Sequence, residues 1–356
     1  MINLKDYVCV YPFKNIEIHE TNVHFCCPEW LPYSISPADG PTNEMWNSDM
    51  AVDIRKSVMD GSYKFCDKKM CPHLNSLLTF GKDTKNVVVH KDMLEPSIKK
   101  YYDEGVGNIS ETPQIMQMSF DRTCNLKCPA CRLDFIVQNS KGIERVTKRI
   151  EEITEEFGKN INMIYTSSAG EPFASVATRN FFKNFDKNKY PKLTNIHIHT
   201  NATLLDKDMW ESMRNIHPYV QSIEISIDAA TKETYENKVR IGGDWDKLIN
   251  NLNYIASLPN IKNVKTSFVV QKDNYNEMNL FLTLMKSIFG KKVMVYFSKL
   301  QDWGTFQLGD EFNSMDVSNV DNPEHSNFIE ELKLVYKDPQ FFGNLLHLIP
   351  TDKTII

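Results

Sequence analysis

The middle of the chain alternates between two kinds of hydrophobic pattern. Short stretches in which apolar and polar residues take turns have the spacing of β-strands, and longer stretches with apolar residues every three or four positions have the spacing of helices. The strand-like stretches span residues 114–120, 161–168, 194–200, 222–228, 264–270 and 292–298. The helix-like stretches between them span residues 142–157, 178–185, 206–216, 244–258 and 276–289. This order predicts a parallel α/β sheet or barrel of six units, short of a full eightfold barrel.

One face of the predicted strands is polar. In residues 222–228 the isoleucines lie on one face, and Glu224, Ser226 and Asp228 lie on the other. Barrel strands are normally apolar on both faces, because helices cover one face and the packed interior fills the other. We therefore expect an open barrel with a polar substrate cavity; the alternative is a sheet with one solvated face. His197 and His199 would form part of the cavity wall, although such a pair can also bind a metal.

The eight cysteines form two groups, and all of them lie before residue 132. The second group follows the first predicted strand in "CNLKCPAC", as Cys124, Cys128 and Cys131. Four-iron clusters normally take four cysteine thiolates, so three would leave one iron open to bind something reactive. The alternatives are a zinc site completed from elsewhere in the chain and three ordinary thiols.

"CNLKCPAC" resembles the signature of the radical SAM superfamily, and later motifs of that family follow in order over residues 113–300. The resemblance implies a 4Fe-4S cluster on the three cysteines whose open iron binds S-adenosylmethionine. "SSAGEPF" is similar to the family's GGEP motif, and "HTNATLL" and "ISIDAATKETYENKVRIGG" are similar to its later strand ends. By resemblance, the first motif holds the amino end of S-adenosylmethionine, the second lies near the ribose, and the third lies near the ribose or the methionine carboxylate. The implied residues are Ala169, Gly170, Glu171 and Pro172, then Thr200 and Asn201, then Ser226, Asp228 and Arg240.

Two residues depart from the family pattern. Ala169 stands at the first position of the GGEP motif, and Ala130 stands where the family often has an aromatic residue beside the adenine. The second departure leaves the packing of the adenine at this position unexplained.

The first group of cysteines can supply four thiolates and one spare thiol. A four-thiolate set is enough to close a second 4Fe-4S cluster, and the layout resembles a SPASM/twitch auxiliary-cluster domain that precedes the barrel instead of following it. The implied ligands are Cys9, Cys26, Cys66 and Cys71, with Cys27 left over. Two alternatives stay open: Cys27 replaces Cys26 as ligand, or the same cysteines form a small zinc module.

The predicted fold class is α/β, a partial (β/α)6 TIM-like barrel with additions at both ends. A SPASM/twitch-like domain spans residues 1–84, and a polar linker rich in turn residues spans 85–112. The barrel spans 113–300, and a helical capping segment spans 301–356. Within the last of these, residues 322–336 have the spacing of an amphipathic helix.

The resemblance implies an oxidoreductase that cleaves S-adenosylmethionine to a 5′-deoxyadenosyl radical and takes a hydrogen from its substrate. The auxiliary cluster would accept an electron, and the substrate would be a peptide side chain or a small sugar-like metabolite. An electron donor such as flavodoxin or ferredoxin is the implied partner. Two rivals are a redox-neutral epimerase, with Cys27 as catalytic hydrogen donor, and a zinc-stapled binding protein without enzymatic activity.

Charge and composition exclude some broad classes. The net charge of -5 at pH 7 argues against a general nucleic-acid binder, which needs a basic surface. No apolar stretch is long enough to cross a bilayer, so we expect no membrane segment. The first residues, "MINLKDYVCVYPF", lack the pattern of a secretion signal. We therefore expect a cytoplasmic protein, in which thiols stay reduced.

Overall fold

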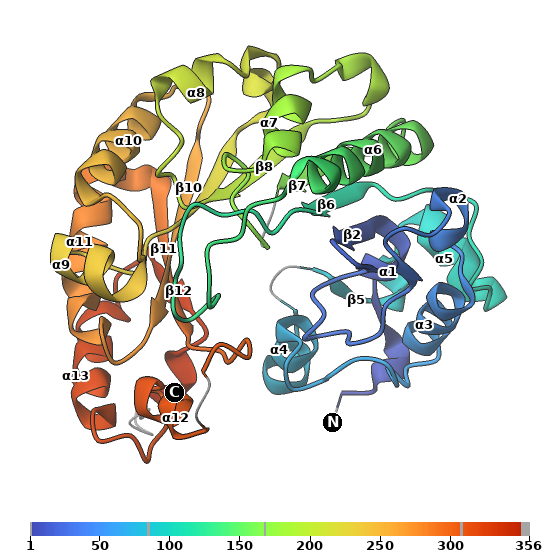
Figure 1. The fold of residues 1–356 in the computed structure, drawn as a ribbon. Helices are drawn as coiled ribbons and strands as arrows, with labels where there is room; N and C mark the ends of the chain where they lie inside the picture. The colour runs from blue at the N-terminus through green and yellow to red at the C-terminus, as the bar shows by residue number, and fades with distance from the viewer. Residues whose placement is uncertain (1, 84–85, 167–168, 307–308, 350–356) are drawn as a thin grey trace. The chain divides into compact units, whose positions relative to one another are not determined.

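The computed structural model describes residues 2–83, 86–166, 169–306 and 309–349 as a mixed α/β fold with a central parallel sheet (Figure 1). The chain forms two compact units, each assembled from separate stretches. The first unit consists of Met1–Asp121, Ser140–Ala169 and Asp186–Ile196. The second consists of Arg122–Asn139, Gly170–Phe185 and His197–Ile356. The domain bounds inferred from the sequence stay a prediction.

The first unit contains the N-terminal elements and the first two strands predicted from the sequence. Its strands are β1 (Tyr7–Cys9), β2 (Asn15–His19), β3 (Asn22–His24), β4 (Ser36–Pro37), β5 (Val88–His90), β6 (Ile115–Ser119) and β7 (Met163–Thr166). Its helices are α1 (Tyr11–Lys14), α2 (Thr42–Met45), α3 (Asp49–Met59), α4 (Pro72–Phe80), α5 (Pro96–Glu104) and α6 (Ser140–Phe157). The strand order here is β7-β6-β2-β3-β4, while β1 and β5 pair separately.

Strand β2 was not expected from the sequence. It runs parallel to β6, with Asn15 opposite Ile115, and antiparallel to β3. Its residues alternate, and the apolar Ile16 and Ile18 are fully buried. Together with β3 and β4, it adds three strands to the sheet before the first strand that the sequence pattern from residue 114 onward indicated.

Helix α5 occupies part of the stretch that was expected to be a featureless linker. Pro96 begins the helix at a position where a missing N–H costs nothing, and Gly105 ends it with a left-handed φ of 66°. Ile98 and Tyr101, three positions apart, bury one side of the helix. Polar residues on its other side account for the linker-like composition.

Arg55 on α3 is a fully buried cation at the centre of the first unit. Burial lowers the pKa of its guanidinium to about 9. The guanidinium donates to Pro12 O (2.8 Å), Trp46 O (2.7 Å), Gly107 O (3.1 Å) and Asn47 Oδ1 (2.9 Å). Its carbon also lies 4.7 Å from the centre of the Trp46 ring. This side chain therefore ties α1, α2, α3 and the segment before β6 together.

We expect Arg55→Met to lower the free energy of unfolding by roughly 3 kcal/mol, because it leaves several buried acceptors without donors. Urea titration of the apoprotein, followed by circular dichroism, measures the change. Arg145→Met is the matched control, since Arg145 is exposed and pairs with Glu20 on the surface. Its expected loss is about 0.5 kcal/mol or less. Equal losses in the two variants would contradict the structural role of Arg55.

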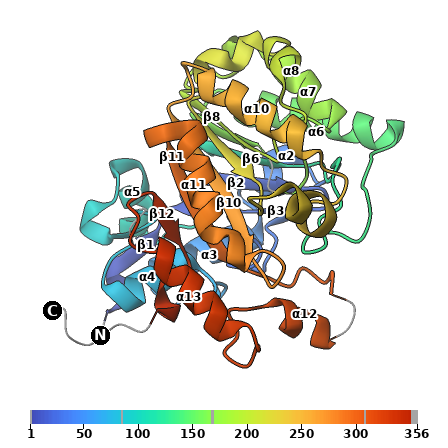
Figure 2. The same ribbon diagram turned by 90° about the vertical axis from the view of Figure 1, so that its left-hand side faces the viewer.

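The second unit contains the remaining four predicted strands in consecutive parallel order. Its strands are β8 (Asn195–Thr200), β9 (Ser222–Ser226), β10 (Asn263–Val270), β11 (Val293–Lys299) and β12 (Phe341–Gly343), all parallel. Its helices are α7 (Val176–Lys183), α8 (Lys207–Glu211), α9 (Lys232–Thr234), α10 (Trp245–Ser257), α11 (Met278–Phe289), α12 (Gly309–Met315) and α13 (His325–Val335). Helices α10, α11 and α13 lie along one side of these strands (Figures 1 and 2).

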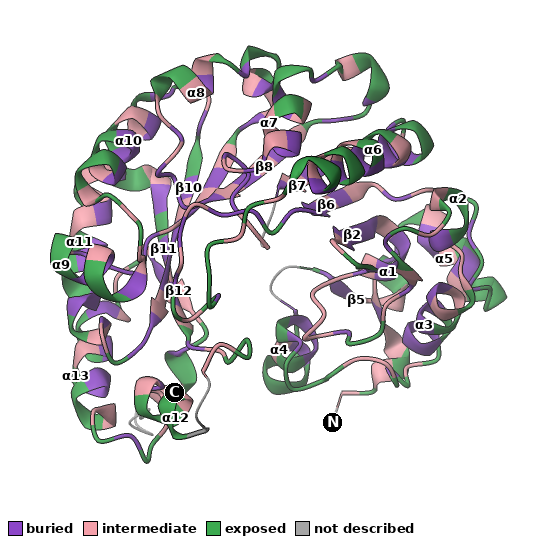
Figure 3. Ribbon diagram, viewed as in Figure 1, coloured by how far each residue is buried: buried purple, intermediate pink, exposed green. Residues whose placement is uncertain are grey.

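The six predicted strands are confirmed as β6 to β11, and the amphipathic helix near the C-terminus is confirmed as α13. In β8 and β9 every second residue is buried, and the residues between are only partly covered (Figure 3). Ile198, Ile223 and Ile225 are fully buried. The alternation read from the sequence thus corresponds to one apolar, covered face and one polar, accessible face.

Candidate functional site

The loop of residues 122–139 presents the three cysteines of "CNLKCPAC". Cys124 and Cys128 are buried, and Cys131 is exposed. Two backbone bridges hold the loop: Cys124 N donates to Ile136 O, and Lys127 N donates to Ile241 O, both at 2.9 Å. The three thiols are therefore presented on a loop fixed at two points.

Positively charged donors reach two of these sulfurs. Arg240 Nη1 lies 3.4 Å from Cys128 Sγ, and Arg132 Nη2 lies 3.4 Å from Cys131 Sγ. Burial raises the pKa of Cys124 and of Cys128, while Arg132 and Arg240 respectively counteract that rise. Because a metal cluster takes cysteine as thiolate, the cations and the three sulfurs make a donor set that fits a cluster.

Glu171 joins two of the predicted motifs. Its Oε1 accepts a hydrogen bond from Thr200 Oγ1 (2.7 Å), and its Oε2 accepts one from the backbone N–H of Asn201 (2.7 Å). Its own N–H donates to Thr123 O, next to Cys124. Burial raises the pKa of Glu171 to about 7, although these donors favour the charged form. Glu171 thus holds the end of β8 beside the cysteine loop.

The end of β8 also approaches the cysteine loop directly. Asn201 Nδ2 donates to Asn125 Oδ1 at 3.1 Å, and Asn125 Nδ2 donates to Thr203 Oγ1 at 2.8 Å. The next residue, Ala202, has a left-handed φ of 60°. A non-glycine residue in this region is strained, and such positions are concentrated at functional sites.

Asp228 and Arg240 form a fixed ion pair at the end of β9. Asp228 Oδ2 lies 2.6 Å from Arg240 Nη2, and Asp228 Oδ1 accepts a hydrogen bond from Val269 N at 2.8 Å. Burial raises the pKa of Asp228, while Arg240 opposes that rise. Asp228 also has a left-handed φ of 62°, held by Asn274 Nδ2, which donates to Asp228 O. The pair holds the Arg240 guanidinium beside Cys128.

The remaining predicted cofactor residues are less engaged with the cysteine loop. Ala169 and Gly170 are partly exposed and Pro172 is buried, while residues 167 and 168 of the same motif lie outside the described residues. Ser226 Oγ bonds to His199 Nε2 (2.8 Å) and to Ser267 Oγ (3.1 Å). Ser226 is therefore part of the polar strand face.

That polar face carries a charged cluster across three strands. Lys265 Nζ lies 2.8 Å from Glu224 Oε1, and the Nε2 atoms of His197 and His199 lie 3.8 and 3.9 Å from the same carboxylate. Against the effect of burial, these groups hold the pKa of Glu224 well below its usual range, so the carboxylate is ionised. Burial lowers the pKa of His199. Lys265 also lies over the Tyr296 ring, at 4.4 Å. The cluster offers several hydrogen-bonding groups on one face of the sheet.

Cysteines of the first unit affect one another electrostatically. Burial raises the pKa of the Cys26 thiol, and the charges of Cys9, Cys66 and Cys71 raise it further. Burial, followed by Cys71, raises the pKa of Cys66 to about 12. Thiols that repel one another's ionised forms in a covered site need a metal to become thiolates together. Tyr63, close by in the chain, has a left-handed φ of 47°.

Cys27 is placed differently from its neighbour Cys26. Burial raises the pKa of the Cys27 thiol to about 11, and the charged groups that affect it are Glu17 and Glu29, not the other cysteines. Among the residues described, no group of three or more His, Cys, Asp and Glu side chains has the geometry to hold a single metal ion.

Sequence reasoning did not single out Arg132 or Asn125. Both lie within or next to the cysteine motif, and the structure places both in contact with predicted site residues. Their position in the sequence could have indicated a role in the site, because an arginine directly after the third cysteine places a cation beside the expected thiolates.

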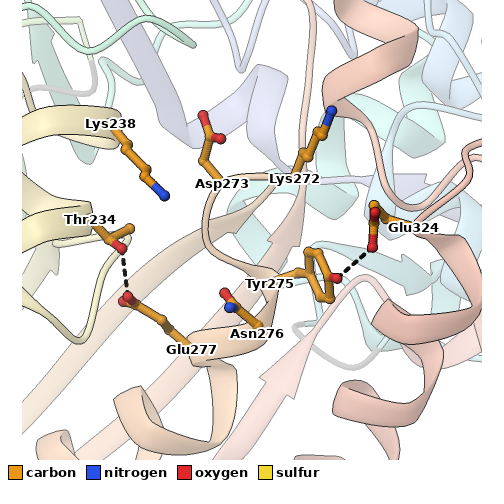
Figure 4. A pocket seen from close by; sticks show the side chains of 8 residues that line it. All are labelled: Thr234, Lys238, Lys272, Asp273, Tyr275, Asn276, Glu277 and Glu324. Carbon is orange, nitrogen blue, oxygen red and sulfur yellow. Dashed lines mark hydrogen bonds between the residues drawn. The ribbon is translucent and has the colours of Figure 1, made fainter.

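A separate open cavity of about 240 Å³ lies in the second unit (Figure 4). Its walls combine both signs of charge, and Glu277 within it accepts a hydrogen bond from Thr234 Oγ1 at 2.6 Å. Tyr275 OH donates to Glu324 Oε2 at 2.7 Å. None of the predicted site residues lines this cavity; the residues that do are Thr234, Lys238, Lys272, Asp273, Tyr275, Asn276, Glu277 and Glu324.

Comparison with known families decides the assignment. Residues 118–285 match the model of the radical SAM superfamily. The chain carries a radical SAM domain. The matched residues include the cysteine loop and the ends of β8 and β9, where the contacts described above lie. A radical SAM domain implies an enzyme of radical chemistry that binds S-adenosylmethionine and a 4Fe-4S cluster.

Three solved structures resemble the chain at low identity. Streptococcus suis SuiB bound to precursor peptide SuiA matches with 14% identity and a TM-score of 0.47, over 83% of this chain and 62% of SuiB. TYW1 with a lysine-pyruvate adduct bound matches with 15% identity and a TM-score of 0.38, over 64% of this chain and 71% of TYW1. Archaeal TYW1 matches with 14% identity and a TM-score of 0.33, over 57% of this chain and 67% of that chain.

No curated protein matches the sequence. Among the described residues, no helix combines the length and the apolar character needed to span a bilayer.

Proposed function

We propose that this radical SAM protein is an oxidoreductase with an auxiliary 4Fe-4S cluster. It would reductively cleave S-adenosylmethionine to a 5′-deoxyadenosyl radical, take a hydrogen atom from its substrate and pass an electron to the auxiliary cluster. The observation that carries this proposal is the convergence of Glu171, Asn201 and Arg240 on the loop of three cysteines.

Each part of the site has a distinct task in this proposal. Cys124, Cys128 and Cys131 hold the first cluster, which leaves one iron open for S-adenosylmethionine. Residues 169–172 and the end of β8 hold its amino end and ribose, and Arg240, positioned by Asp228, provides the cation for its carboxylate. Glu171 is buried and the side chain of Arg240 is 12% exposed, so little water reaches these contacts and their strength increases.

The auxiliary cluster would be held by Cys9, Cys26, Cys66 and Cys71. Their mutual effect on pKa supports this set and favours Cys26 over Cys27 as ligand. The domain would occupy residues 1–84, followed by the linker of 85–112, the barrel of 113–300 and the capping segment of 301–356.

The substrate would bind at the polar face of β8, β9 and β10. Charged and hydroxyl groups there suit a polar substrate, either a peptide side chain or a small sugar-like metabolite. An ionised carboxylate and a lysine in a half-covered site are costly unless they are used, which supports a binding role for Glu224 and Lys265. A cytoplasmic one-electron donor such as flavodoxin or ferredoxin would supply the electron for each turnover.

One observation favours a second candidate, a redox-neutral epimerase. Burial keeps Cys27 protonated at neutral pH, and a protonated thiol is the form that donates a hydrogen atom. In this alternative Cys27 returns a hydrogen to the substrate from the opposite side, and the oxidation level of the product is unchanged.

We expect Glu171→Ala and Arg240→Ala each to weaken the binding of S-adenosylmethionine. Charge-assisted hydrogen bonds are worth about 1.5–3 kcal/mol, which corresponds to a dissociation constant raised roughly 10- to 150-fold. Anaerobic isothermal titration calorimetry on the reconstituted protein measures the change. Lys127→Ala is the matched control, because Lys127 lies on the same loop with its side chain partly exposed. Affinity equal to wild type in both site variants would refute the transfer of these motifs.

A further inference from the structure

Arg132 contacts Cys131, and both terminal nitrogens of its guanidinium donate hydrogen bonds. Only 8% of the residue is exposed. Its Nη2 donates to Cys131 Sγ at 3.4 Å, and its Nη1 donates to the backbone oxygen of Arg122 at 3.0 Å. The guanidinium therefore cannot leave the sulfur without also losing a backbone hydrogen bond.

Arg132 and the cysteine loop affect one another electrostatically. Burial would lower the pKa of the guanidinium, but Cys131, Cys124 and Cys128 together raise it. The same charge counteracts the effect of burial on Cys124. The guanidinium is thus a fixed, buried positive charge within electrostatic reach of each predicted ligand of the first cluster.

The four cysteines of the first unit have a different environment. There burial raises the pKa of each thiol, the other cysteines raise the pKa of Cys26 and Cys66 further, and Lys68 is the cation that lowers the pKa of Cys66. In the part of the chain that the structure describes, guanidinium-to-cysteine hydrogen bonds occur at Cys128 and Cys131. The two groups of cysteines therefore differ in the positive charge that lies next to their sulfur atoms.

Hydrogen bonds to cysteine sulfur and the local net charge set the reduction potential of an iron–sulfur cluster. Uptake of one electron makes the site more negative, and a nearby fixed cation stabilises that charge in a covered environment. We propose that Arg132 raises the reduction potential of the cluster held by Cys124, Cys128 and Cys131. Arg132 is a positioning residue for electron uptake. This inference rests on one part of the proposed function, which is the presence of the cluster on Cys124, Cys128 and Cys131.

Potentiometric titration of the whole reconstituted protein, followed by electron paramagnetic resonance, tests the inference. Dithionite supplies the electrons, and S-adenosylmethionine is left out except in one parallel sample, where it perturbs the signal of the open cluster and so identifies it. We expect Arg132→Met to make reduction of that cluster at least tenfold less favourable, which is a shift of about 59 mV to more negative potential for a one-electron couple. Arg132→Lys keeps the charge but loses the two-pronged contact, so its shift is expected to be smaller and in the same direction.

Two controls separate a local effect from a general one. Arg122→Met removes a charge from the same loop while leaving the backbone oxygen that Arg132 contacts, and Arg122 is exposed. We expect this variant to have the wild-type potential. The auxiliary cluster in the Arg132→Met protein is the internal reference, and its potential is also expected to be unchanged.

Several outcomes would overturn the inference. The first such outcome is an Arg132→Met protein with its full iron content in which the reduction potential of the open cluster is unchanged. If that variant takes up no iron, Arg132→Gln, which also removes the charge, decides, and a wild-type potential there refutes the inference. Failure of both variants to bind iron while Arg122→Met binds it normally would assign Arg132 to cluster assembly instead. If titration of the wild-type protein reveals a single cluster, that result contradicts the auxiliary site. It does not contradict the inference about Arg132, because the shift in the potential of the open cluster can still be measured.

Discussion

Anaerobically reconstituted protein is expected to contain about eight irons per chain, in two four-iron clusters. Changing Cys124, Cys128 and Cys131 together to alanine should leave about four, because the structure places these thiols and the N-terminal thiols in different compact units. Iron analysis and the visible absorption of the brown protein measure the loss. A zinc module in the first unit would instead give a triple variant that is colourless and contains zinc.

Single cysteine variants sharpen this test. Cys27→Ala is the matched control, since the groups that shift the pKa of Cys27 include Glu17 and Glu29 but none of the proposed ligands, and it should keep about eight irons. Cys26→Ala should reduce iron to about four or make the auxiliary cluster labile. The reverse result for these two neighbours would show that Cys27 is the ligand. Retention of all iron by the triple variant would end the assignment of the open site.

Removal of the auxiliary cluster with Cys66→Ala and Cys71→Ala is expected to abolish oxidised product. The same variant should still form 5′-deoxyadenosine from S-adenosylmethionine, because the open cluster lies in the other unit and supports that step alone. The physical reason is that a substrate radical becomes a closed-shell product only by losing an electron or by gaining a hydrogen. Liquid chromatography with mass spectrometry measures 5′-deoxyadenosine and product in one sample.

Turnover in deuterated water separates the two candidate functions. A product lighter by two hydrogens, without carbon-bound deuterium, is expected for the oxidoreductase. A product of unchanged oxidation level with one carbon-bound deuterium, lost in Cys27→Ala, would establish the epimerase. Full product formation by the Cys66→Ala and Cys71→Ala variant would also exclude the auxiliary cluster as electron acceptor. Circular dichroism shows whether that variant folds, and the 5′-deoxyadenosine yield shows whether its second unit works.

The strands were predictable where the alternation of residues was long and uninterrupted. β8 and β9 place an isoleucine on the covered face at successive alternate positions, and a period of two is typical of a strand with one covered face. Strand β2 has the same alternation, but it lies between cysteines and pairs with a strand 100 positions further along. Such distant pairing leaves no local signal. Helix α5 was missed because its buried side consists of only two residues, Ile98 and Tyr101.

The candidate site could be predicted as a set of residues but not as a set of contacts. The resemblance to radical SAM motifs indicated Glu171, Asp228 and Arg240, yet gave no reason to pair Asp228 with Arg240 or Glu171 with Thr200. These pairs depend on how several strand ends are placed side by side. The sequence could not decide between Cys26 and Cys27 as ligand for a similar reason. Neighbouring side chains point in different directions, and only the local backbone conformation decides which thiol joins the others.

The parallel pairing of β2 with β6 also has a consequence for how the protein is made. Asn15 pairs with Ile115, so the strand that precedes Cys26 finds its partner only after about a hundred further residues have left the ribosome. The first compact unit is complete only when Asp186–Ile196 has been synthesised. Chains that stop before β6 lack the parallel partner of β2, so the unit that contains the N-terminal cysteines is incomplete in them. We therefore expect any metal that these cysteines bind to be loaded late in translation.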